Sequence, residues 1–169
     1  MSIIKKTIFL FFITFLLNTN AFSQEVKKIG KYKDWETIVF IDGNNKICFA
    51  QSVPVLQAPK KNPRDARLFV SFRPNDKILD EVSITSGYEY NDQNSTTATS
   101  GKSKYKFDIV RENFAWISES KVEKKMIKTL KKGSRIMVTG YNKSGSQTID
   151  HYSLLGFTKA YNSAKKNCS

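Results

Sequence analysis

Apolar and polar residues alternate through much of the chain after residue 24, and this pattern predicts a protein built mainly of β-strands. One case is 67–73 (RLFVSFR), where Leu68, Val70 and Phe72 occupy every second position, and the cleanest is 104–109, where Tyr105, Phe107 and Ile109 do. A period of two places such residues on one face of a strand. Alternating or β-branched segments with the same implication are 32–41, 46–53, 82–90, 104–109, 114–117, 135–141 and 147–155.

Turn and loop signals separate these segments. Asp42-Gly43-Asn44-Asn45 favours a hairpin turn between the first two strands. The polar lead 24–30 is expected to be mobile, and 54–65 carries prolines among lysines and is expected to be a loop. Segment 91–103 lacks apolar content, so we expect it to be the longest flexible loop of the domain.

Two segments change to a helical period. In 121–132 the apolar residues fall near helical spacing and Gly133 ends the pattern; they are Val122, Met126, Ile127 and Leu130. A second helix is predicted after Gly156 on a stripe formed by Phe157, Ala160, Tyr161 and Ala164. The predicted fold is mostly β, a single-domain β-sandwich or partly open barrel with two short helices, the second at the C-terminus.

The first 23 residues have the three parts of a secretory signal peptide. Two lysines come first, 8–17 (IFLFFITFLL) is almost wholly apolar, and 21–23 (AFS) offers small side chains for cleavage before Gln24. The apolar run is about half of the roughly 20 residues that a membrane-spanning helix needs. We therefore expect residues 24–169 to form one exported domain, periplasmic or secreted and not membrane-spanning.

Two cysteines, Cys48 and Cys168, remain for an oxidising compartment. An even pair there favours a disulfide, and one pair has a single intramolecular connectivity. Two free thiols or an intermolecular link are the alternatives, because a sequence does not show the distance between the two Cα atoms. A zinc site of four Cys and His ligands is not expected with His151 as the chain's one histidine, and no cofactor is predicted.

The basic residues of the chain argue against a nucleic-acid partner. It has 28 basic and 15 acidic residues, and most of the basic ones are lysine, whereas nucleic-acid readers depend on arginine. An exported lysine-rich surface suits anionic lipid, lipopolysaccharide or an acidic protein, although it could also be only a solvated surface. The best candidate for contact with an anionic surface is the predicted helix 121–132, with its Lys121, Lys124, Lys125, Lys128, Lys131 and Lys132.

Three sequence blocks resemble the invasion-associated locus B family. They are Asp34-Trp35, Cys48-Phe49-Ala50-Gln51 and the segment 152–160 (YSLLGFTKA), in an order and spacing that cover the mature chain. The resemblance implies an exported protein of alphaproteobacteria with a signal peptide and one compact, mostly β domain. It implies no enzymatic activity, and it attaches a role in host-cell invasion to pathogenic members.

The chain departs from the family at its cysteines. Similar sequences usually carry a cysteine shortly after the first-strand tryptophan, near Phe40 here, and a cysteine pair near 115–118. That usual disulfide pattern is not available, so Cys48 must find another partner or none.

No group of residues forms a catalytic pattern. Asp150 and His151 are adjacent in a predicted strand, so their side chains point to opposite faces and cannot form the orienting hydrogen bond of a general base. Asp76, Asp80 and Glu81 lack the spacing of a calcium loop and are expected in a solvated turn. Trp35 and Trp116 are expected in the core rather than on an exposed binding platform; a platform remains the alternative.

These observations favour a non-enzymatic exported domain that binds an envelope component or a partner protein in the periplasm. The alternative is a secreted or surface-exposed factor in host-cell interaction. An enzyme is the third hypothesis and the one with least support, since neither a nucleophile–base pair nor a metal set is visible.

Overall fold

Two antiparallel β-sheets face each other in the computed structural model, which describes residues 24–169. The predicted signal peptide, residues 1–23, lies outside the described residues. The larger sheet has seven strands in the order β1 (Gln24–Tyr32), β2 (Trp35–Asp42), β3 (Asn45–Ser52), β5 (Arg67–Arg73), β6 (Ile78–Thr85), β10 (Phe114–Trp116) and β9 (Ile109–Arg111). The smaller sheet has five, in the order β4 (Leu56–Ala58), β12 (Gln147–Ser153), β11 (Arg135–Tyr141), β7 (Thr96–Ser100) and β8 (Ser103–Phe107).

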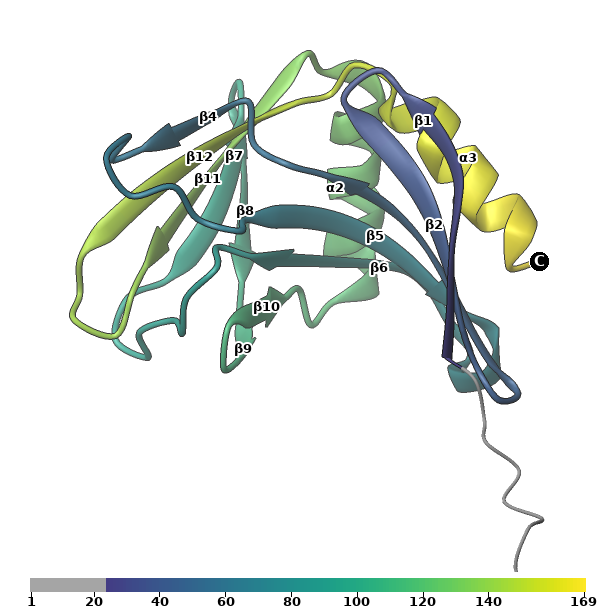
Figure 1. Ribbon diagram of the computed structural model, residues 1–169. Helices are drawn as coiled ribbons and strands as arrows, with labels where there is room; N and C mark the ends of the chain where they lie inside the picture. Colours follow the sequence, from purple (N-terminus) through teal and green to yellow (C-terminus); the bar gives the residue numbers. More distant parts are fainter. Residues whose placement is uncertain (1–23) are drawn as a thin grey trace, which may run out of the picture.

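Two α-helices complete the fold, α2 (Ser120–Lys132) and α3 (Phe157–Asn167), together with the short 3-10 helix η2 (Pro74–Asp76). Figure 1 shows the five-stranded sheet on the left and both α-helices on the far side of the seven-stranded sheet. The predicted sandwich with two helices, the second at the C-terminus, is confirmed.

Trp35 connects the parts of the core. Its side chain is fully buried, and its ring meets that of Phe157 edge-on at 4.8 Å between centroids. Its indole Nε1 donates to the carbonyl of Ser153 at 2.8 Å, which satisfies the one polar atom of the buried ring. A single residue thus joins β2 to β12 and α3, and the prediction that Trp35 lies in the core is confirmed.

Strands occur in three segments that were predicted to have none. In 54–65, expected to be a loop, Leu56–Ala58 forms β4 and pairs with β12. Residues 24–30, expected to be mobile, belong to β1, which pairs with β2 from Gln24↔Asp42 to Tyr32↔Trp35. Most of β1 is exposed, so its apolar residues do not recur at every second position. The strand is defined instead by its backbone pairing with β2. Within 91–103, β7 fills the place between β8 and β11, where Thr96 and Ala98 are buried. A threonine-rich strand carries little apolar signal even when its neighbours bury it.

The two cysteines form a disulfide between β3 and the C-cap of α3. Cys48 and Cys168 have Cα atoms 5.8 Å apart and are 120 residues apart in the sequence. The bridge confirms the favoured prediction. It holds the end of α3 on the buried face of β3, where the carbonyl of Ala160 in the same helix accepts a hydrogen bond from the Thr37 hydroxyl at 2.9 Å.

We expect the bridge to supply a large part of the stability of the domain. Removing it with Cys48→Ser and Cys168→Ser together should lower the free energy of unfolding by about 4 kcal/mol, because the unfolded chain regains the entropy of a long closed loop. Urea unfolding of both proteins measures this difference, and a thiol assay on unreduced wild type should find no free thiol. Two titratable thiols in the native protein would contradict the bridge.

Candidate functional site

The basic helix has the amphipathic arrangement that the sequence predicts. Helix α2 buries Met126, Ile127 and Leu130, and Val122 is half-buried. All six of its predicted lysines are exposed: Lys121, Lys124, Lys125, Lys128, Lys131 and Lys132. The apolar stripe therefore faces the core, and the lysines form one charged outer surface.

Glu123 is the residue of this helix that sequence reasoning missed. It is 7% exposed, and its Oε1 accepts a hydrogen bond from the backbone N–H of Val82 at 2.9 Å. Strand β10 pairs with β6 only from Ser83 to Thr85, so the N–H of Val82 lies beyond the end of that ladder. Glu123 thus takes the place of a neighbouring strand, which is why a carboxylate occurs on the buried side of an amphipathic helix.

A cleft of about 610 Å³ opens where β10 ends and α2 begins beside β6. Its apolar lining comes from Ile78, Leu79, Ile109, Trp116 and Ile117. Leu79 is 62% exposed and Ile109 is 40% exposed, which leaves a large apolar surface in contact with solvent. The charged lining has both signs and consists of Arg73, Lys77, Arg111, Lys124, Asp80, Glu81 and Glu123.

Asp76, Asp80 and Glu81 lie at the edge of this cleft. A solvated turn was expected for them, but all three carboxylates are bound by other side chains. Arg73 binds both oxygens of Glu81, at 2.9 and 2.8 Å, and its Nε lies 3.1 Å from Asp76. Asp80 accepts a hydrogen bond from the hydroxyl of Tyr161 in α3 at 2.5 Å. The carboxylates hold η2, β6 and α3 together, so their role is structural.

An aromatic row crosses the seven-stranded sheet from β3 to β10 and ends at the cleft. We use this name for Phe49, Phe69, Phe114 and Trp116. Successive ring centroids are 5.8, 6.2 and 5.7 Å apart, which is the spacing of interacting aromatic pairs.

Small residues on β6 allow the row to continue across that strand. Phe69 on β5 and Phe114 on β10 flank β6, where Ser83 and Thr85 are their cross-strand partners. Both partners are nearly buried, at 6% exposure each. Their short side chains leave room for the two phenylalanine rings to meet above them.

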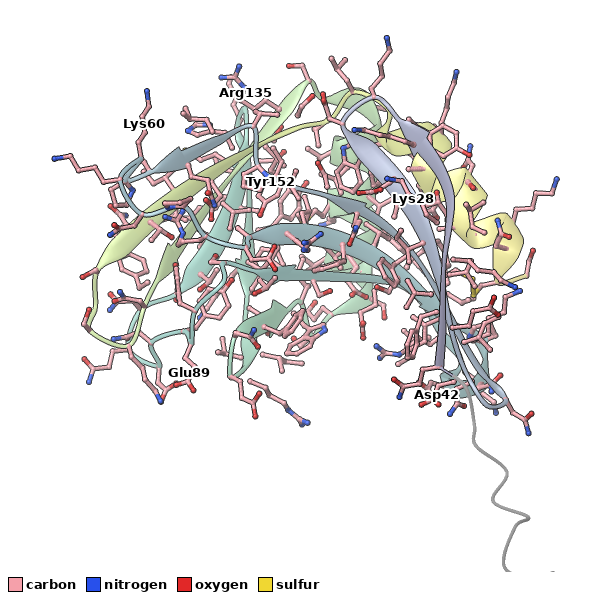
Figure 2. The ribbon with its side chains drawn as sticks, in the orientation of Figure 1. Lys28, Asp42, Lys60, Glu89, Arg135 and Tyr152 are labelled. Atoms are coloured by element: carbon pink, nitrogen blue, oxygen red, sulfur yellow. A yellow bond between two sulfur atoms is a disulfide. The ribbon has the colours of Figure 1, made fainter. Side chains whose placement is uncertain are left out.

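The row lies on the face of the sheet that no other layer covers within residues 24–169. The opposite face carries Trp35, Thr37, Cys48 and Phe72, which contact α3, and it shares one core with the five-stranded sheet. Figure 1 views the sheet with the helices behind it, so the uncovered face is toward the reader. Figure 2, in the same orientation, labels Tyr152 of β12, a fully buried residue of that shared core.

Trp116 corrects one of the predictions from sequence. It was expected in the core, but it is half-buried, stacks on Phe114 and lines the cleft. The neighbouring Ala115 points to the core instead, with no exposed surface. In a three-residue strand the apolar pattern FAW does not tell which face is buried, so sequence alone could not place the tryptophan.

Asp150 and His151 are neighbours in β12, and the Asp150 carboxylate is bound by other side chains. Asp150 is fully buried, and its Oδ1 accepts hydrogen bonds from Arg64 Nη2 at 2.5 Å and from Gln57 Nε2 at 3.1 Å. Burial raises the pKa of Asp150, and the charge of Arg64 acts in the opposite direction. The Arg64–Asp150 ion pair joins the loop between β4 and β5 to β12. Breaking one member of a buried pair is costly, which fits a structural role.

The described residues, 24–169, include no cluster of three or more His, Cys, Asp or Glu side chains able to hold a metal ion. Over the same range, no helix is long and apolar enough to cross a membrane.

These features define the chain as a disulfide-linked β-sandwich domain with an uncovered aromatic sheet face. A family model described as Invasion associated locus B (IalB) protein matches residues 35–165. The chain therefore belongs to the invasion-associated locus B family, which confirms the resemblance seen in its sequence. A search of curated proteins and a search of solved structures each gave no match.

Glu123 should make the stability of the domain depend on pH. Burial raises its pKa above the usual 4.5, the hydrogen bond from Val82 lowers it, and the charges of Glu81 and Asp80 raise it further. A raised pKa means that the folded state holds the proton more tightly, so this contribution stabilises at low pH and is lost as pH rises through the folded-state pKa. Glu123→Gln keeps an acceptor for Val82 but removes the charge, and it should raise the melting temperature at pH 7.

Thermal unfolding between pH 4 and pH 7 tests this expectation. The gain from Glu123→Gln should shrink as pH falls, because the wild-type side chain becomes neutral too. Glu119→Gln, at the exposed start of the same helix, is the matched control and should show no such trend. A variant that melts below wild type at pH 7 would show that the charged form of Glu123 is the stabilising one.

Proposed function

We propose that this protein is an exported, non-enzymatic binding domain that holds an envelope component or partner protein on the uncovered face of its seven-stranded sheet. One observation carries the proposal: the aromatic row lies on a sheet face without a covering layer and leads into a cleft of about 610 Å³. The row is half-buried, and with the exposed Leu79 and Ile109 of the cleft it leaves apolar surface in contact with solvent. Contiguous apolar surface of this kind marks interaction sites on monomeric domains.

The composition of this surface favours a polypeptide over a small apolar ligand. Aromatic residues, tryptophan above all, are enriched among the residues that dominate protein interfaces. The cleft adds arginine and lysine as well as carboxylates, which can pair with charges of either sign at the rim of an interface. Trp116, at the point where row and cleft meet, is the proposed anchor.

Structural roles for the polar clusters support the non-enzymatic part of the proposal. The buried Asp150 is engaged by Arg64 and Gln57, and Arg73 engages Glu81 and Asp76. His151 lies on the opposite side of β12 from Asp150, and within residues 24–169 no carboxylate pairs with it in the way a general base requires.

An extracytoplasmic location is supported by the disulfide and by the family. Export predicts that the mature protein begins at or near Gln24, so N-terminal sequencing of the purified native protein tests it. Recovery of intact Met1 in the membrane fraction would contradict it. Fractionation separates the two locations: retention in the periplasm favours the envelope role, and exposure on the outer surface favours the host-interaction alternative.

The lysine surface of α2 supports a second candidate function, weak adhesion to anionic lipid or lipopolysaccharide. Each lysine near an anionic membrane surface contributes about 1 kcal/mol. Because Met126, Ile127 and Leu130 are buried in the fold, such contact would be electrostatic, without insertion, and would weaken as salt rises.

Site-specific photo-crosslinking tests the aromatic row. A photoreactive phenylalanine at Phe49 or Phe114 should give an envelope adduct in living cells, and one at Lys60, on the loop after β4, should not. With the partner in hand, Trp116→Ala should weaken binding by about 30-fold or more, the loss typical of an interface anchor. Leu56→Ala removes an exposed apolar side chain of the other sheet and should change binding little. Equal losses of binding affinity for Trp116→Ala and Leu56→Ala would contradict the proposal that the aromatic row is the binding surface.

A further inference from the structure

A second pocket, of about 710 Å³, lies where three segments distant in sequence meet. These are the turn between β1 and β2, the C-terminal end of α2, and the link from β12 to α3. Figure 1 shows the three together at the top of the view. The pocket shares no lining residue with the cleft beside Trp116.

All charged residues that line this pocket are positive. They are Lys31, Lys33, Lys131 and Lys159. None of these four has an ion-pair partner within residues 24–169. Lys28 binds the Glu36 carboxylate and is the main cause of its lowered pKa, to which the charge of Lys31 contributes less. The pocket thus gathers four lysines, and no carboxylate is among its lining residues.

The fold holds the walls of the pocket in place. Gly156 has φ +95°, and a Cβ there would lie 1.7 Å from the carbonyl oxygen of Tyr32, so only glycine permits this close approach. The backbone N–H of Asp34 also donates to the carbonyl of Leu155 at 3.2 Å. The two contacts fix the lysine-bearing turn against the start of α3.

Lys131, near the end of α2, is also held in place, by contact with Tyr161 of α3. Its ammonium lies 3.9 Å from the centre of the Tyr161 ring, a cation–π contact. The positive end of the α3 dipole adds to the potential, whereas the C-terminal end of α2 opposes it. Four ammonium groups outweigh the partial charge of one helix end, so the net potential in the pocket is positive.

The rest of the lining is largely apolar. Tyr32, Leu154 and Leu155 lie beside the lysines, and Leu155 is 60% exposed. Ammonium groups next to an exposed aliphatic side chain fit a ligand with an anionic head and an apolar part. Lysine binds phosphate as a compact point charge with three donors, and phosphate offers several acceptor oxygens to a cluster of ammoniums.

We propose that this pocket binds the phosphate group of an amphiphile such as a phospholipid, with the four lysines around the phosphate and Leu155 against its apolar part. The site is separate from the aromatic row, and three of its four lysines lie outside α2.

Vesicle co-sedimentation with phosphatidylglycerol in phosphatidylcholine tests the site. At about 1 kcal/mol per lysine, Lys33→Gln with Lys159→Gln should weaken binding by about 30-fold. Lys60→Gln with Lys61→Gln makes the same change of charge on exposed residues of the loop after β4 and should alter binding less than threefold. Equal losses for the two pairs would mean that only total charge matters and would overturn the proposal.

The α2 variant Lys124→Gln, Lys125→Gln, Lys128→Gln separates this pocket from the basic helix. If that variant loses vesicle binding while the pocket variant keeps it, the helix is the lipid contact and the pocket proposal is wrong. Amide shifts of Thr158 and Lys159 on addition of inorganic phosphate, at constant ionic strength set with chloride, form the second arm. Amide shifts with phosphate together with binding to vesicles support a phosphate-bearing amphiphile as the ligand. Amide shifts without vesicle binding support the site but assign free phosphate as its ligand. No binding in either arm overturns it.

Discussion

The C-terminal helix α3 is fixed at both ends, and the arrangement of the whole domain depends on this. At its start, Gly156 lets the chain pass against the Tyr32 carbonyl, and at its end Cys168 is bonded to Cys48 on β3. Between these points Phe157 and Tyr161 meet the rings of Trp35 and Phe72. The helix therefore stays on the core face of the larger sheet, and that face has no room for a partner.

Because α2, α3 and the smaller sheet all use one face of the larger sheet, its other face has no covering layer among residues 24–169. In an antiparallel sheet with one solvent-exposed face, the side chains on that face are ordinarily polar. Here Phe49, Phe69, Phe114 and Trp116 occupy it, and they bury one another only in part. Apolar residues at these positions add little to the core, and the proposed binding surface would account for them.

Much of this fold follows from the sequence, but its surfaces follow less well. The period of two in 67–73 predicts β5 with its bounds, and the helical stripe of 121–132 predicts α2 nearly to the residue. Strand β7 and the buried Glu123 were not foreseeable, since both are defined by backbone groups of neighbouring strands rather than by their own side chains. The aromatic row has the same origin: Phe69 and Phe114 are 45 positions apart in the numbering and meet only through the order of β5, β6 and β10.

The aromatic row and the lysine pocket can be occupied at the same time. The pocket lies at the end of β1 and β2 where the chain turns, whereas the row crosses the middle of β3 and β5 and reaches β10. A phosphate-bearing surface bound at Lys33 and Lys159 would leave Phe49 and Trp116 accessible. Since α3 forms one wall of the pocket and covers the core face behind the row, the same fixed helix sets the orientation of both surfaces. If both proposed sites bind as argued, the rigid domain would hold a partner protein at a fixed distance from an anionic surface.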